Sequence, residues 1–101
     1  MGSRLELHEI FCDILGSRNA YFQPPSSVRM KYPAIVYARK EIENRFADDL
    51  VYLQNNSYEV TVIDREADSE IVKKISLLPK CKFDRHFVSD NLYHDLFVLY
   101  F

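Results

Sequence analysis

The stretch AIVYARKEIENRF, residues 34–46, constrains the fold more than any other part of the chain, because neither glycine nor proline interrupts it. Side chains of a strand alternate between two faces, whereas a helix needs apolar residues at every third or fourth position. Scored as a helix, the apolar stripe would contain Arg39 and Glu43. Scored as a strand, the stretch separates into an apolar and a charged face: Val36, Ala38, Ile42 and Phe46, against Arg39, Glu41, Glu43 and Arg45. We therefore predict one long strand with a charged face.

Two helices are predicted from apolar residues at helical spacing. The first covers residues 4–15 and ends at Gly16, because glycine readily adopts the left-handed backbone conformation found at helix C-termini. The second lies within residues 64–79, where Asp68 or Ser69 can cap the first turn. The apolar stripe of the first helix needs a partner, and a sheet is the most available one.

Three further strands follow from β-rich runs. Residues 58–64 should return antiparallel to the long strand after a turn region over residues 47–57. Residues 81–89 and 92–101 should form a second hairpin, because the Asp-Asn pair between them tolerates the positive φ of a tight turn.

These elements predict a single α+β domain over residues 1–101. Residues 17–33 are expected to be an exposed loop, with room for a short extended piece at residues 21–23. In chain order the prediction is helix, loop, two strands, helix and two strands. The four-stranded sheet would be antiparallel or mixed, and both helices would pack on one of its faces.

Composition argues against several functional classes. The formal net charge of -2 gives no basic excess for nucleic acid, and two glycines are too few for a phosphate-binding loop. No apolar run approaches the roughly 20 residues that span a bilayer. The two cysteines lack a CxxC spacing, and without a secretory leader we expect reduced thiols in the cytosol. We expect no membrane contact and no cofactor.

The last hairpin holds the best candidates for chemistry, because histidines and aspartates lie close together in its sequence. With the predicted turn, His86 sits opposite Asp95 and His94 opposite Phe87, so the two histidines point to opposite faces of the sheet. One histidine–carboxylate pair then remains, which is typical of a structural contact between strands. We therefore expect that the chain is not an enzyme.

The succession of three stretches carries a family resemblance: YPAIVY at residues 32–37, YEVTVIDREADSEIV at 58–72, and LPKCKFDRHFVSDNLYHDLFVLYF at 78–101. It resembles proteins of the tail-terminator or tail-completion type, encoded among the head and tail genes of long-tailed bacteriophages and of prophages in Gram-positive bacteria. The resemblance implies a helix-plus-sheet fold and a homo-oligomeric ring, a hexamer. Such a ring caps the tail tube at its head-proximal end and joins it to the head connector. The protein would reside in the host cytoplasm during assembly and in the virion afterwards.

Within that interpretation, roles can be assigned by position. The charged strand face would contact neighbouring subunits through Arg39, Glu41, Glu43 and Arg45. Two loops would face the tail tube or the connector, and they contain Tyr21, Phe22, Asp48, Asp49 and Tyr52.

Other interpretations stay open at this point. The charged face can equally be a solvated surface that discourages uncontrolled strand pairing. The chain could also be another minor capsid or neck protein, or an accessory domain that binds a single host or phage protein. A small cytosolic enzyme or ligand-binding domain would use the region of His86, Asp95 and Cys81.

Overall fold

The structure is a computed structural model. It describes the backbone of residues 4–47 and 50–101 and the side chains of residues 4–40 and 57–101. The elements along the chain are α1 (Arg4–Leu15), β1 (Ala20–Phe22), β2 (Ala34–Ala47), β3 (Leu50–Asp64), α2 (Glu70–Ser76), β4 (Cys81–Ser89) and β5 (Leu92–Tyr100). The α+β class is as predicted.

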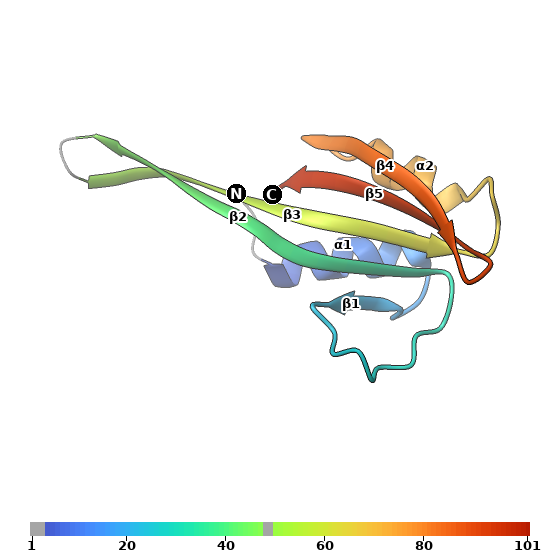
Figure 1. Cartoon of the computed structure of the whole chain (residues 1–101). Coiled ribbons are helices and arrows are strands. Elements are labelled where there is room, and N and C mark those ends of the chain that lie inside the picture. Colours follow the sequence, from blue (N-terminus) through green and yellow to red (C-terminus); the bar gives the residue numbers. More distant parts are fainter. Residues whose placement is uncertain (1–3, 48–49) are drawn as a thin grey trace.

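The strands form one mixed sheet in the order β1-β2-β3-β5-β4 (Figure 1). The prediction of four strands is wrong by one, because the short extended piece near residue 21 pairs with β2 as a parallel edge strand. Backbone bonds fix it at both ends: the Ile35 N–H donates to the Asn19 carbonyl at 3.1 Å, and the Gln23 N–H donates to the Tyr37 carbonyl at 2.9 Å. All other neighbouring strands are antiparallel.

β3 begins at Leu50 instead of residue 58, so the predicted turn over residues 47–57 is wrong. The strand pairs with β2 as far as Ala47, which lies opposite Leu50. The reason is visible in the sequence LVYL at residues 50–53, because apolar, β-branched and aromatic residues favour an extended chain over a turn.

Local signals place both ends of α1 and the start of α2 as predicted. Gly16 ends α1 with φ 70°, and its N–H donates to the Cys12 carbonyl at 2.9 Å. Ser69 caps α2, and its hydroxyl oxygen accepts a hydrogen bond from the Ile71 N–H at 3.2 Å. α2 is shorter than the predicted range, because it ends at Ser76.

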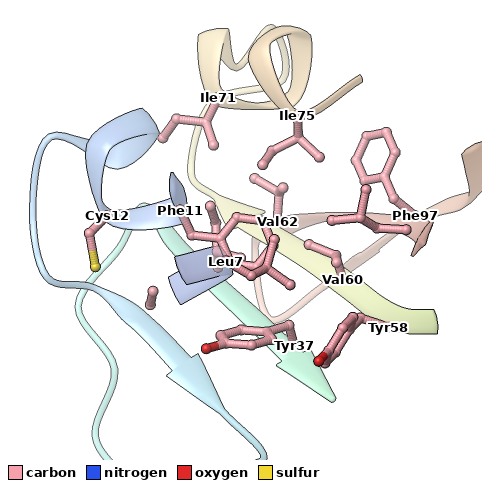
Figure 2. Packing of buried hydrophobic residues seen from close by; sticks show 13 residues of the cluster. Leu7, Phe11, Cys12, Tyr37, Tyr58, Val60, Val62, Ile71, Ile75 and Phe97 are labelled. Carbon is pink, nitrogen blue, oxygen red and sulfur yellow. The ribbon is translucent and has the colours of Figure 1, made fainter. Parts of the chain in front are cut away.

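Both helices cover the same face of the sheet, as predicted. Leu7 and Phe11 of α1 and Ile71 and Ile75 of α2 belong to one buried cluster. The sheet completes this cluster with alternate residues of β2, β3 and β5, as Figure 2 shows for Tyr37, Tyr58, Val60, Val62 and Phe97. Burying one large apolar side chain stabilises a fold by about 1.5–3 kcal/mol, so this face supplies most of the stability.

Candidate functional site

β2 and β3 extend well beyond the rest of the sheet. β1 pairs with β2 at residues 35–37, and β5 pairs with β3 at residues 57–64. Past these positions, residues 41–47 and 50–56 continue as a two-stranded ribbon, which we call the projecting hairpin (Figure 1). The molecule therefore measures 52 Å along its longest axis but 26 and 23 Å along the others.

A bulge at Lys40 divides the charged face that the sequence predicted. Arg39 lies opposite Tyr58 of β3, whereas Glu41 lies opposite the adjacent Ser57, so Lys40 is the extra residue. A bulge of this kind reverses the alternation of faces beyond it. Arg39 therefore lies on the helix-covered face, with its guanidinium carbon 6.0 Å from the centre of the Tyr58 ring. The prediction that Arg39 shares a face with Glu41 is wrong.

The other charged positions keep a common face. Glu41, Glu43 and Arg45 pair with every second residue of β3, beginning at Ser57. By this register they lie on the face opposite the helices, while Ile42 moves to the helix side, away from Val36 and Ala38. Their side chains fall outside the described part of the structure, so their contact with neighbouring subunits stays a prediction.

Two predicted loop residues belong to β1. Phe22 packs against the core, with its ring centre 5.0 Å from that of Tyr37 and the Arg4 guanidinium carbon 4.4 Å from it. The Lys31 N–H donates to the hydroxyl of the half-buried Tyr21 at 3.3 Å. Phe22 thus packs against the core beside Arg4 of α1, and Tyr21 fixes the loop that leads to β2; their contact with a tail tube stays a prediction.

The remaining loop predictions fall on the end of the projecting hairpin. Asp48 and Asp49 lie outside the described residues. Tyr52 lies within β3, at a register shift where Arg45 pairs with Leu53 and the next residue of β2 pairs with Val51. Tyr52 is thus a bulge residue in a strand, and its placement in a loop is wrong.

β4 is an edge strand with an open outer side in the described chain. All of residues 82–89 are exposed, and three of them are large and apolar: Phe83 at 52%, Phe87 at 41% and Val88 at 55%. An exposed edge with apolar side chains can pair with a further strand. The sequence predicted the hairpin of residues 81–101 but not this surface, because it did not show which of the two strands would lie outermost.

A second bulge, between Phe83 and Arg85, sets the faces of β4. On the face away from the helices lie Lys82 and Arg85, opposite Val98 and Leu96 of β5. On the helix side lie Phe83, His86 and Val88, opposite Phe97, Asp95 and Tyr93. Lys82 and Lys40 also line a shallow pocket of about 300 Å³, together with Asp84 and Tyr100. Lys82 and Arg85 therefore make the first half of β4 basic on the side that faces away from the helices, and Phe87 follows on that side opposite His94.

The histidine–aspartate pair forms as predicted. His86 Nδ1 lies 2.9 Å from Asp95 Oδ1, and the imidazole stacks on the Tyr93 ring at 6.1 Å. His94 is directed to the other face, where it stacks on Phe87 at 4.6 Å and its Nδ1 donates to the Leu92 carbonyl at 3.1 Å. The two histidines do not converge.

Neither cysteine is activated for nucleophilic chemistry. Cys12 is buried in α1, and burial raises the pKa of its thiol. Burial likewise raises the pKa of the Cys81 thiol. Cys81 pairs with Leu99 near the far end of β5 from Asp95, about 13 Å away at the usual strand rise, so it does not join the histidine pair. A raised thiol pKa disfavours the reactive thiolate.

Sequence analysis also missed a polar contact beneath α1. The hydroxyl of Tyr37, a fully buried residue of β2, lies 2.7 Å from Nδ1 of His8. Burial raises the pKa of Tyr37 and lowers that of His8, and the positive charge of Arg18 lowers the pKa of His8 further. A neutral imidazole and a neutral phenol therefore share this hydrogen bond. Because the partners are 29 positions apart, no local pattern could have predicted it.

Comparison of the sequence with protein-family models and with curated proteins found no match. In the part of the chain that the structure describes, His, Cys, Asp and Glu side chains do not gather in threes as metal ligands would. Across the same residues, no helix has the length and apolar character needed to cross a bilayer.

Proposed function

We propose that this protein is a structural component of a long-tailed phage or prophage, of the tail-terminator or tail-completion type. Copies of the chain form a closed ring, a hexamer, that caps the head-proximal end of the tail tube and joins it to the head connector. The proposal rests on the family resemblance carried by residues 32–37, 58–72 and 78–101.

The observation that supports it best is the projecting hairpin. Residues 41–47 and 50–56 lie past the last pairing of β3 with β5 and past β1, so in the described part of the chain β2 and β3 pair there with each other alone. A two-stranded ribbon by itself is marginally stable in water. A second molecule that covered the ribbon would stabilise it. Such an extension is therefore typical of a protein that functions as part of an assembly.

The His86–Asp95 pair does not favour the alternative of an enzyme. Its imidazole side chain is 44% exposed, and the pair lies on an edge strand. The described residues around it supply a stacking ring but neither a nucleophile nor a second histidine. The pair serves as a contact between β4 and β5.

Mass in solution tests the proposal. Light scattering from micromolar to near-millimolar protein should reveal a closed multiple of 12.0 kDa, and the transition should shift with salt because the strand faces are charged. Negative-stain microscopy of purified tail tubes incubated with the protein should show one ring at one end of each tube. A strict monomer that leaves the tubes unchanged would contradict the proposal.

A further inference from the structure

We propose that the open edge of β4 in one copy pairs with the β2 strand of the projecting hairpin in a second copy. This inference rests on the proposed ring and names the two surfaces that build it. The two surfaces belong to opposite edges of the sheet, so the contact is head-to-tail and can repeat around a ring.

Strand directions permit this contact. β2 is antiparallel to β3, β3 to β5, and β5 to β4, so β4 and β2 of one copy run in opposite directions. When a second copy stands beside the first in the same orientation, its β2 meets β4 as an antiparallel neighbour and the faces of the two sheets coincide. Antiparallel pairing is the more stable arrangement per residue.

The position along β2 is also determined. β1 covers the outer side of β2 at residues 35–37, so an incoming β4 edge finds β2 open only beyond them. The second copy must therefore be displaced along the strand direction, away from the tip of its projecting hairpin, so that the hairpin comes level with β4 of the first copy. Closed sheets require a displacement of this kind between neighbouring strands.

The two strands complement one another in charge. On the face away from the helices, β4 presents Lys82 and Arg85, and β2 of the projecting hairpin places Glu41 and Glu43 on the same face by its register. The bulge in β4 spaces its two basic residues three apart, with Phe83 and Asp84 between them. A bulge sets two residues opposite one, so three positions of β2 match this span.

One register satisfies these positions over residues 81–86 of β4; past them β4 must diverge from β2, because residues 88 and 89 would otherwise reach the positions of β2 that β1 covers. Glu41 of the second copy lies beside Arg85, and Glu43 lies beside Lys82. Between them, Ile42 of the second copy lies next to the exposed Phe83, both on the helix side of the sheet. Arg45 then falls past the first residue of β4. Opposite charges and an apolar pair thus coincide at successive positions, which is how paired strands stabilise one another.

Charge reversal tests the contact. One variant carries Lys82→Glu and Arg85→Glu, another carries Glu41→Lys and Glu43→Lys, and a third combines all four changes. Each double variant should weaken self-association about tenfold or more, and the fourfold variant should recover most of that loss. The matched control for the β4 variant is Lys73→Glu with Lys74→Glu on the exposed side of α2, which makes the same change in net charge as Lys82→Glu with Arg85→Glu and should leave association unchanged.

Association is read by light scattering, and capping of tail tubes by the same variants is read by microscopy. Circular dichroism confirms that each variant is folded. Rings that form equally well in both double variants would overturn the contact and leave the ring intact. Loss in both double variants without recovery in the fourfold variant would also overturn it. If the unaltered protein neither associates nor caps tubes, the proposed function fails, and this contact fails with it.

A covalent test is independent of charge. In a Cys81→Ser background, Glu43→Cys combined with Lys82→Cys should give a ladder of disulfide-linked multiples under mild oxidation, ending at the closed species. Glu43→Cys alone should stop at linked dimers or below. Absence of the ladder in a preparation that light scattering shows to be associated would overturn the contact.

Discussion

Tyr37 contacts aromatic and polar side chains from three different elements, α1, β1 and β3. Its ring lies 5.0 Å from the rings of both Phe11 and Phe22 and 6.2 Å from that of Tyr58, while its hydroxyl bonds to His8. The aromatic ring and the hydroxyl can be tested separately, because phenylalanine keeps the first and removes the second.

Tyr37→Phe should lower the free energy of unfolding by about 1 kcal/mol, since the half-buried His8 can turn to water when its partner is lost. Tyr37→Ala should lower it by about 3–5 kcal/mol, because it leaves a cavity between α1 and β2. Urea denaturation of both variants measures the difference. Equal losses would show that the hydroxyl matters as much as the ring.

The environment of His8 makes stability depend on pH. Burial first, and then the positive charge of Arg18, hold the pKa of His8 below its ordinary value of 6.5; Glu9 opposes them, and Arg4 adds a smaller lowering. In the unfolded chain His8 takes up a proton near pH 6.5, whereas the native protein resists it. The unfolded state therefore binds more protons in this window, and stability falls as the pH drops below 6.5.

His8→Gln should reduce this fall, because glutamine can keep a hydrogen bond to Tyr37 but carries no titrating group. Urea midpoints at pH 7.5, 6.5 and 5.5 measure it, and these values lie above the range in which Glu9 titrates. The pH dependence left in the variant is the contribution of the rest of the chain. If variant and unaltered protein show the same slope, His8 is not the cause.

At the scale of the element, α2 depends on its cap. Ser69 is buried at the start of this short helix and satisfies the Ile71 N–H. Ser69→Ala should lower the free energy of unfolding by about 1 kcal/mol, whereas Ser69→Asp should retain most of it. Thermal unfolding measures both. Ser76→Ala, at the exposed end of the same helix, is the matched control and should change stability by less than about 0.5 kcal/mol.

The sequence predicted those elements whose signals are local. Gly16 and Ser69 marked helix ends, and Asp90 and Asn91 form the positive-φ turn that aligns His86 with Asp95. Bulges escaped prediction, because the extra residue is defined only by the strand that it faces. For this reason the alternation of faces predicted for residues 34–46 was correct before Lys40 and after it, but residues before Lys40 do not share the predicted faces with residues after it.

β1 and the β4 edge escaped prediction for a related reason. Three residues carry too weak a pattern to predict a strand, and β1 exists because β2 offers it backbone partners. The outermost position of β4 follows from the choice of β5 as the partner of β3. The hydrophobic pattern cannot decide which strand of the last hairpin pairs with β3, because apolar and polar residues alternate in both strands. Of the candidate site, the sequence indicated the charges of β2 but not the exposed edge of β4.

At the scale of the whole molecule, the two edges of the sheet differ. At one edge, β1 covers only three residues of β2, and β2 continues past it into the projecting hairpin. At the other edge, β4 is open along its length. The helices are confined to one face (Figure 1). Stability thus resides in the helix-covered body, while the surfaces available for assembly lie at the margins of the sheet.

In the proposed ring, this asymmetry would give each copy two different ends, as in a polymer built from a bifunctional monomer. Growth of such a chain stops only when the last copy reaches the first, so the displacement between neighbours decides between a closed ring and an open filament. A copy that retains β4 but cannot offer its hairpin would terminate every chain that it enters. A small fraction of such copies would then prevent a much larger fraction of the rings from closing, because a ring closes only when every one of its members is intact.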